Sequence, residues 1–225
     1  MYTIKIDYHK PFKDGISGKV IELRDHQIKA IKAVFSKIKS RQNGYICIAK
    51  GCGNSTTSFR LAQLLENKHH KVVYLTSPDI LRKLPSAISF RKGSSLIKNF
   101  NNKNLICTTN GILFNALKKS RKKFNREKCI FIYDECRWAC TNNKHELFKS
   151  LFNNSLFYGF TNSPIYMNTS IYDKTSKKIF SNELYSYNLK DALNDGYQTP
   201  FKIKYFNVPT DSKKKSFNSF KLHYT

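Results

Sequence analysis

The stretch Tyr45–Thr57, which reads YICIAKGCGNSTT in one-letter code, decides the fold of this chain. Its first part is a short apolar run typical of a buried strand, and a loop of small residues then leads into a helix-like segment. This order predicts a loop whose backbone N–H groups, together with the helix N-terminus, can cradle phosphate. One residue departs from the usual pattern. Such loops end in Gly-Lys-Ser/Thr, whereas Asn54 stands here between Gly53 and Ser55.

Short apolar runs alternate with segments of helical periodicity on both sides of this stretch. Strands are expected at 45–49, 72–75, 105–107, 129–133 and 156–160. Helices are expected from the candidate N-cap Asp25, from about 59 to 65, from Ser77, over 109–117 and around 147–152. Strict alternation with strands that are apolar on both sides predicts an α/β fold, with a parallel sheet covered by helices on both faces. Ligands of such sheets bind at the carboxyl ends of the strands.

Two acidic residues follow the most apolar of the predicted strands. Asp134 and Glu135 come directly after the run Cys129–Tyr133, about 80 residues beyond the phosphate-type loop. At a strand end the first carboxylate can hold Mg²⁺, directly or through water, and the second can polarise an attacking water. Such a pair alone also occurs at an ordinary solvent-facing strand end.

The net charge of +25 points to a polyanionic partner. Nucleic acid is the first candidate and an anionic membrane the second. Codon bias toward lysine is a competing explanation for part of the charge, because lysine supplies 32 of the 40 cationic residues. The basic connector 120–128 fits either a solvated loop or a phosphate contact.

The six cysteines include no Cys-x-x-Cys pair, and four of them lie in apolar runs or beside the candidate nucleotide loops. This pattern favours reduced, buried thiols in an intracellular protein. No signal region opens the chain, and no apolar run approaches the ~18 residues needed to cross a bilayer. We therefore expect a soluble, cytoplasmic protein without a membrane partner.

Taken in order, seven segments resemble the motifs of superfamily 2 helicases, namely of their N-terminal RecA-like domain. The nearest branch holds the helicase/UvrB N-terminal domain and the motor subunits of restriction enzymes. Each motif is degenerate, but their order and spacing together are specific. The segments are Leu23–Ile31, Ala49–Ser55, Tyr74–Pro78, Cys107–Thr109, Asp134–Arg137, Gly159–Pro164 and Tyr187–Tyr197.

This resemblance implies an RecA-like fold of the P-loop NTPase type, with ATP and Mg²⁺ as cofactors. It implies a nucleotide site made of Gln27, which reads adenine, and of Gly51, Cys52, Gly53, Asn54, Ser55 and Thr56. It implies Mg²⁺ ligation by Ser55 and Asp134, with Asp134 and Glu135 catalytic. It implies coupling of hydrolysis to movement through Arg137, Thr161 and Ser163, and nucleic-acid contacts at Ser77, Pro78, Thr108 and Thr109.

The domain boundaries expected on this basis are an N-terminal extension at 1–20, a RecA-like domain at 20–207 and a flexible basic tail at 208–225. The second RecA-like domain that a helicase needs is expected to come from elsewhere, as a separate domain or subunit. Three departures affect the chemistry: Asn54 replaces the phosphate-loop lysine, Arg137 replaces a histidine, and Asn162 and Ser163 alter the sixth motif.

Three functions remain open at this point. The first is a DNA-dependent ATPase or translocase motor domain that binds DNA and ATP. The second is a catalytically inactive paralogue that serves as a nucleic-acid-binding or scaffold module. The third is an unrelated basic Rossmann-like domain that binds RNA or a ribosome. Neither enzymatic activity nor the choice between DNA and RNA follows from the sequence, although DNA is the first expectation.

Overall fold

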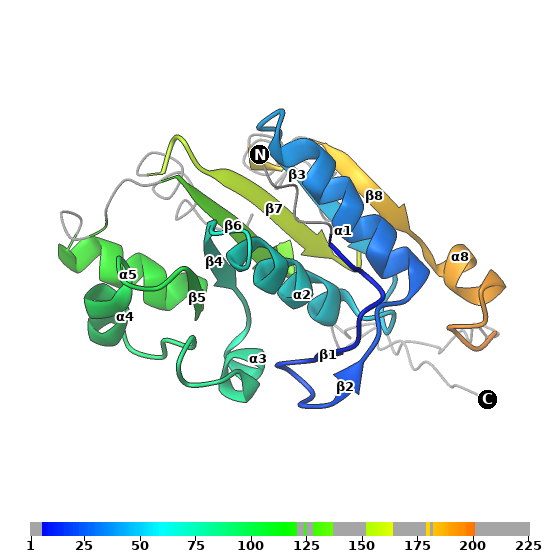
Figure 1. The fold of residues 1–225 in the computed structure, drawn as a ribbon, viewed down its shortest axis with the longest axis horizontal. Coiled ribbons are helices and arrows are strands. Elements are labelled where there is room, and N and C mark those ends of the chain that lie inside the picture. Colours follow the sequence, from blue (N-terminus) through cyan, green and yellow to red (C-terminus); the bar gives the residue numbers. More distant parts are fainter. Residues whose placement is uncertain are drawn as a thin grey trace, which may run out of the picture.

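The computed structural model of the 225-residue chain describes residues 6–120, 124, 128–136, 152–163, 179–180 and 182–200. A six-stranded sheet lies at its centre, with strand order β5-β4-β6-β7-β3-β8 and parallel pairing throughout (Figure 1). The α/β fold class predicted from the alternation is therefore confirmed. The strands are β3 (Gly44–Ile48), β4 (Lys71–Leu75), β5 (Leu105–Thr108), β6 (Cys129–Asp134), β7 (Leu156–Thr161) and β8 (Glu183–Tyr187).

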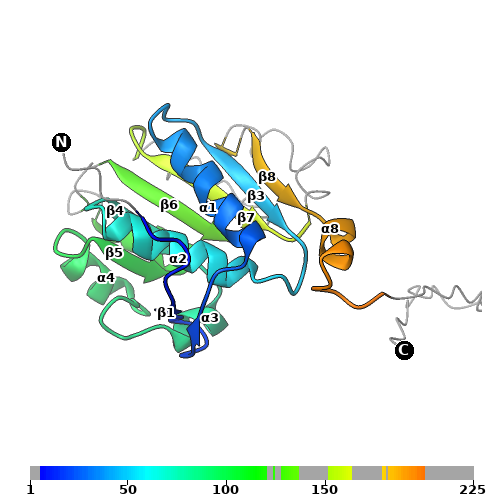
Figure 2. The same ribbon diagram turned by 45° about the vertical axis from the view of Figure 1, so that its right-hand side comes forward.

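Helices cover both faces of this sheet. The described helices are α1 (Asp25–Ile38), α2 (Asn54–Glu66), α3 (Pro78–Lys83), α4 (Gly93–Asn99), α5 (Asn110–Ser120) and α8 (Leu189–Asn194). The first two pack on one face, and α4 and α5 pack on the other (Figures 1 and 2). Because side chains alternate along a strand, β4 sends Val72 and Tyr74 into the first core and Val73 and Leu75 into the second.

A small hairpin precedes α1 and packs on the same core as α1 and α2. Strand β1 (Phe12–Lys13) pairs antiparallel with β2 (Val20–Ile21), and Phe12 is buried in that core. The Asp14 carboxylate accepts hydrogen bonds from the backbone N–H groups of Ile16 and Ser17, which closes the turn. The expected boundary at residue 20 therefore falls inside this hairpin.

The start of α1 differs from the prediction by one residue. Arg24, with extended backbone, is the N-cap, and Asp25 is the first helical residue, so the assignment of Asp25 as N-cap was wrong. The side chain of Gln27, three residues after the cap, accepts a hydrogen bond from the Arg24 N–H at 2.9 Å. This contact satisfies a backbone group at the helix start, and Asp25 still places its negative charge in the first turn.

The five cysteines within the described ranges are buried free thiols. In this part of the chain no helix has the length and the apolar character needed to cross a membrane.

Candidate functional site

The loop between β3 and α2 takes its shape from two glycines. Gly51 and Gly53 have φ of 85° and 87°, in the left-handed region that disfavours residues with a Cβ. Gly53 is the N-cap of α2, and its carbonyl accepts hydrogen bonds from the N–H and hydroxyl of Thr57 at 2.9 and 2.7 Å. The Cys52 side chain is fully buried beneath the loop. The backbone thus curls around the N-terminus of α2, as the sequence predicts for a phosphate-binding loop.

Asp134, at the end of β6, meets the first turn of α2. The Ser55 hydroxyl donates to one carboxylate oxygen at 3.0 Å, and the Thr76 hydroxyl donates to the other at 2.9 Å. The residue is only 7% exposed. Burial raises the pKa of the Asp134 carboxyl, and the hydrogen bonds from Thr76 and Ser55 oppose that rise. The predicted convergence of the loop with Asp134 at one edge of the sheet is confirmed by these contacts.

Thr76 is a residue of this site that the sequence analysis did not single out. It follows β4, which lies beside β6, and its side chain is buried against the carboxylate. Tyr74 and Ser58 lie close by, with 3.2 Å between their hydroxyl oxygens, and Ser58 donates to the Ser55 carbonyl at 3.0 Å. A polar residue directly after the apolar run 72–75 was the available signal, the same kind of signal that identified Asp134.

Asn54 is the first residue of α2 and carries the main chemical departure of the loop. Its amide oxygen and nitrogen are both buried, and neither has a hydrogen-bond partner among the described residues. Leaving buried polar groups unpaired costs about 1–3 kcal/mol each. An amide at this position therefore has bonding capacity left for a ligand that occupies the loop.

Gln27 lies against the loop rather than open to solvent. It is 5% exposed, its amide oxygen is engaged by the Arg24 N–H, and its amide nitrogen lies 3.4–3.5 Å from the carbonyl oxygens of Gly53 and Cys52. A Cβ on Gly53 would come within 2.3 Å of that nitrogen. Gln27 and the loop therefore fit together only because position 53 is glycine.

An aromatic cluster supports the same side of the loop. His26 stacks on Tyr187 at 4.1 Å between ring centroids, and its Nε2 lies 2.9 Å from the Cys52 carbonyl oxygen. Burial lowers the pKa of His26, so the ring is neutral at pH 7 and donates to that carbonyl through Nε2–H. The Gln198 amide donates to the carbonyl of Lys50 at 2.8 Å, which ties the segment after α8 to the start of the loop.

The residues expected to act with Asp134 lie at the same edge. Glu135 follows β6 with φ of 64°, a left-handed conformation that is uncommon for a residue with a side chain. At the end of the adjacent β7, the Thr161 hydroxyl lies 3.2 Å from both the N–H and the carbonyl oxygen of Ser163, so these two residues form one turn. Arg137 lies outside the described residues.

The four residues expected to contact nucleic acid differ in their exposure. Ser77 and Pro78 are exposed at the start of α3, and Thr109 is half-buried before α5, where its hydroxyl accepts the Ile112 N–H. Thr108 is fully buried, and its hydroxyl donates to the Phe90 carbonyl at 2.9 Å. The Thr108 side chain is therefore not available to an external phosphate, whereas the other three lie at the strand-end edge.

A family model described as SWI2/SNF2 ATPase matches residues 26–220, which is most of the chain. The chain belongs to the SWI2/SNF2 ATPase family. It is thus the N-terminal RecA-like domain of a superfamily 2 helicase-type motor, as the ordered motifs predicted. The match begins at the start of α1, so the SWI2/SNF2 ATPase region includes both the phosphate-type loop and Asp134.

One relative and two solved structures are similar to this SWI2/SNF2 ATPase region. The endonuclease subunit of a type I restriction enzyme from Staphylococcus aureus is 28% identical over 208 residues, covering 84% of this chain and 22% of that subunit. The chain thus spans about a fifth of that relative. The helicase domain of Pyrococcus furiosus Hef has a TM-score of 0.52 at 18% identity, covering 74% of this chain and 39% of that one. The DNA-bound Type ISP restriction-modification enzyme LlaBIII has a TM-score of 0.54 at 15% identity, covering 82% and 16%. At these identities the two structures support the fold alone.

Proposed function

We propose that this motor domain binds a magnesium nucleotide at the loop 49–53 and contacts nucleic acid, DNA in the first place, at the ends of β4 and β5. The observation that carries the nucleotide part is the Ser55–Asp134 hydrogen bond at 3.0 Å. A hydroxyl at a helix N-terminus and a strand-end carboxylate, side by side next to a glycine loop, are the two protein ligands that Mg²⁺ takes in P-loop proteins.

The residues fit such a ligand in most respects. Two left-handed glycines hold the loop, Asn54 has unpaired amide atoms, and α2 presents its positive N-terminal end. Backbone N–H groups of Gly51 and of residues 53–56 would bind phosphate, whereas the Cys52 N–H already donates to the Ala49 carbonyl. Ser55 and Asp134 would hold Mg²⁺. The bound metal supplies charge neutralisation on the phosphates.

Other residues would act around the phosphates. Glu135 would orient the attacking water. Thr161 and Ser163 would couple hydrolysis of the nucleotide to movement of the motor. Arg24 and Gln27 would border the base, with Gln27 held by the contacts already described. Asn54 is a neutral, shorter donor than the usual lysine, so we expect weak nucleotide binding and slow hydrolysis.

A second candidate function rests on the same residue. Without the lysine, the domain can serve as a nucleic-acid-binding scaffold that has lost nucleotide chemistry. The two candidates separate in one experiment, a titration of a fluorescent ATP analogue with and without Mg²⁺. Magnesium-dependent binding supports the first, and its absence up to about 1 mM nucleotide, the weak end of ordinary affinities, supports the second.

The nucleic-acid part has its own measurement. Neutralising phosphates with cations releases counterions, so affinity for duplex DNA is expected to fall steeply between about 50 and 200 mM salt and to depend little on base sequence. Absence of binding at about 50 mM salt, or an affinity that does not change with salt, would rule this part out.

Replacing Thr76 with valine is expected to weaken the effect of Mg²⁺ on nucleotide binding by about 10- to 100-fold, the usual cost of losing a contact that orients a metal ligand. The change keeps the shape of the side chain but removes the hydroxyl that holds Asp134. Magnesium titrations at fixed nucleotide concentration measure it.

Thr108→Val is the matched control, because it removes a buried hydroxyl from the neighbouring strand that does not touch Asp134. Equal effects of the two substitutions would show that the loss reflects general packing and not the orientation of the carboxylate.

A further inference from the structure

Two side-chain amides lie at the phosphate-type loop, and they differ in whether their hydrogen bonds are already made. The amide oxygen and nitrogen of Asn54 are buried and have no partner among the described residues. Gln27 is also buried, at 5% exposed, but both atoms of its amide are bonded to the protein. Asn54 can therefore gain a partner when a ligand arrives, whereas Gln27 has its partners beforehand.

The Gln27 amide uses nearly all of its bonding capacity inside the protein. Its oxygen accepts the Arg24 N–H at 2.9 Å at the start of α1. Its nitrogen has two N–H donors, which bond the carbonyl oxygens of Gly53 at 3.4 Å and Cys52 at 3.5 Å. The one acceptor position left on the oxygen is buried with the rest of the side chain. The edge of a base therefore finds no free donor and no exposed acceptor on Gln27.

Strong discrimination between bases needs polar groups in the site that the wrong base leaves unpaired. One buried group left unpaired lowers the affinity for the wrong ligand by about 5- to 150-fold. Because Gln27 is bonded before any nucleotide binds, neither adenine nor guanine leaves it unpaired. To bond a base, Gln27 would first have to break its bonds to Arg24 and to the loop, so the exchange would gain little free energy.

The exposed groups beside Gln27 suit the face of a base and not its edge. Arg24 is exposed, and its guanidinium carbon lies 4.3 Å from the centroid of the Tyr197 ring, which is 40% exposed. The segment that carries Tyr197 is tied to the loop, because the Gln198 amide donates to the Lys50 carbonyl at 2.8 Å. Bases stack on guanidinium planes and on aromatic rings, and every base has a face that can stack. This pair therefore favours a planar base without choosing between purines.

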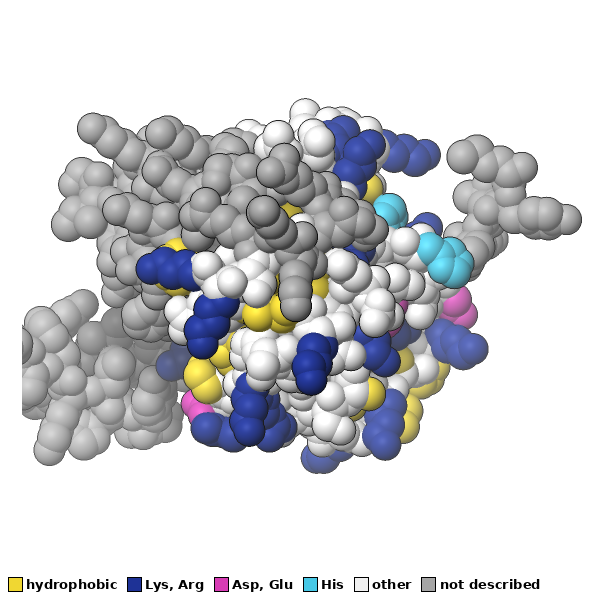
Figure 3. All heavy atoms as spheres, turned by 90° about the vertical axis from the view of Figure 1, so that its left-hand side faces the viewer, with side chains coloured by type: hydrophobic (Ala, Val, Ile, Leu, Met, Phe, Trp, Pro, Cys, Tyr) yellow, Lys and Arg dark blue, Asp and Glu magenta, His cyan; other side chains and the backbone are white. Residues whose placement is uncertain are grey.

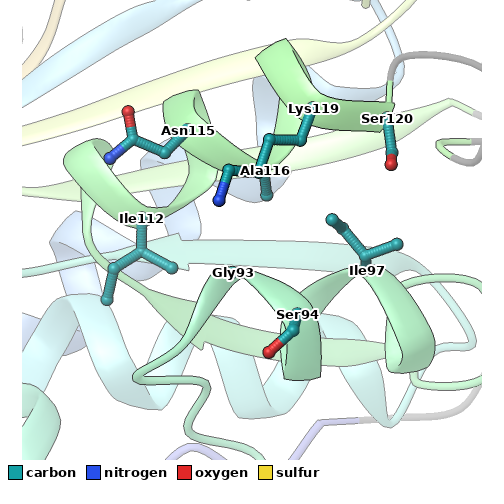
Figure 4. A pocket seen from close by; sticks show the side chains of 8 residues that line it. All are labelled: Gly93, Ser94, Ile97, Ile112, Asn115, Ala116, Lys119 and Ser120. Atoms are coloured by element: carbon teal, nitrogen blue, oxygen red, sulfur yellow. The ribbon is translucent and has the colours of Figure 1, made fainter.

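A hollow between α4 and α5 is not an alternative place for that base. Its volume is about 400 Å³ and its lining is mainly apolar, with Ile97 of α4 and Ile112 of α5 among the lining residues (Figure 4). These helices pack on the face of the sheet opposite α1 and α2. A base attached to phosphates in the loop would lie instead beside the start of α1, where Gln27 contacts the loop.

We infer that the nucleotide site accepts the triphosphates of adenosine and guanosine alike, because Gln27 braces the loop and does not read the base. The inference rests on the nucleotide part of the proposed function. It replaces the adenine-reading role that the helicase resemblance implies for Gln27. Affinity then comes from the phosphates, from Mg²⁺ and from stacking of the base, and Gln27 is a positioning residue.

The test is displacement of a fluorescent ATP analogue, labelled on the ribose, by unlabelled ATP and by unlabelled GTP. The whole chain is used at about 150 mM salt, with and without Mg²⁺. Lys and Arg side chains are spread over the described part of the face in Figure 3, so nucleotides can also associate loosely by charge. Only the Mg²⁺-dependent part of binding is therefore compared. The affinities for ATP and GTP are expected to differ by less than about fivefold, the smallest penalty for one unpaired group.

Replacing Gln27 with methionine separates bracing of the loop from reading of the base. Methionine has a similar length but no amide, so the loop loses both contacts from this side chain. The variant is expected to bind ATP and GTP more weakly by the same factor, and to unfold at a lower temperature than the wild type without nucleotide. Gln63→Met is the matched control, because Gln63 lies on α2 far from its N-terminal end and should leave both affinities unchanged.

The outcomes separate this inference from the proposal beneath it. A wild-type preference above about fivefold for either nucleotide overturns the inference alone. Loss of affinity for ATP but not for GTP in Gln27→Met does the same, because Gln27 then reads adenine. A wild type without Mg²⁺-dependent binding of either nucleotide removes the nucleotide proposal, and the inference with it. If Gln27→Met does not fold, the comparison of ATP with GTP in the wild type still decides.

Discussion

Replacing Asn54 with lysine is expected to tighten binding of ATP with Mg²⁺ by about 10- to 100-fold, while raising turnover much less. A charged hydrogen bond to phosphate contributes about 1.5–3 kcal/mol, and each 1.4 kcal/mol is a factor of ten in affinity. Asn54 is the first residue of α2, and its buried amide has no partner among the described residues, so the lysine replaces no existing contact. Turnover lags because catalytic residues that act as a unit are not restored one at a time.

The matched control is Asn54→Met, which adds similar length without the charge and should leave affinity near that of the wild type. Nucleotide affinity and steady-state phosphate release are measured with and without DNA. DNA-stimulated turnover near ~1 s⁻¹ in the wild type, the low end for ordinary enzymes, would contradict the expectation of a weakened site. Lys50, which is exposed at the start of the loop, would then be the next residue to change.

Replacing Asp134 with asparagine is expected to abolish the Mg²⁺ dependence of nucleotide binding and, at the same time, to stabilise the protein without nucleotide. The carboxylate is the proposed metal ligand, and asparagine keeps its shape but removes its charge. The hydroxyls of Ser55 and Thr76 can rotate to bond the new amide, so few contacts are lost. For Asp134 the cost of burying the charge outweighs the gain from its hydrogen bonds, so removing the charge favours the folded state.

The pH dependence of this effect follows from the raised pKa of Asp134. Between the unfolded pKa, about 4, and the higher folded pKa, the folded state binds more protons than the unfolded state. The free energy of unfolding therefore falls as pH rises through this window and stays lower above it. The advantage of Asp134→Asn should be absent below about pH 4 and should grow as pH rises toward the folded pKa of Asp134. Thermal melts from pH 3 to 8 measure it, with the exposed Asp79→Asn as control; an equal shift in both variants would contradict it.

Motifs that combine a strand with a special loop were predictable because each residue has a chemical reason to stand where it does. The loop has a left-handed backbone at two positions, and glycine is the residue that adopts this conformation most easily. Asp134 ends an apolar strand, so it is expected at the edge of the sheet where the strands have their carboxyl ends. Both features are local in sequence. Their contact through Ser55 followed from the general rule that strand carboxyl ends share one edge.

Elements without such local signals were missed. Strand β8 is only five residues long and buries only Tyr187. Helix α4 begins with Gly-Ser-Ser and buries only Leu96. Their existence depends on tertiary packing against β3 and α5. Strand order likewise depends on long-range pairing, which no single segment encodes.

Side-chain direction set the remaining limit at the site. The sequence predicted that Gln27 lies at a helix start and Thr108 at a strand end, but it did not predict that both side chains are buried. Gln27 turns toward the loop because the Arg24 N–H needs an acceptor, and Thr108 turns toward the Phe90 carbonyl. Thr76 was missed because its role depends on a contact between two strands. Its hydroxyl bonds Asp134 only because β6 lies beside β4, and this pairing cannot be read from the residues around Thr76.

The left-handed backbone of Glu135 has a consequence for anyone who tries to improve this protein. That conformation costs a residue with a Cβ about 1–2 kcal/mol, a penalty from which glycine is exempt. A library screened only for heat resistance would accordingly enrich glycine at 135 and asparagine at 134. The variants selected in this way would lack the carboxylates of both Asp134 and Glu135 at the end of β6. Directed evolution of this domain therefore needs a ligand-binding readout in every round, because selection for thermal stability and selection for nucleotide binding favour different residues at positions 134 and 135.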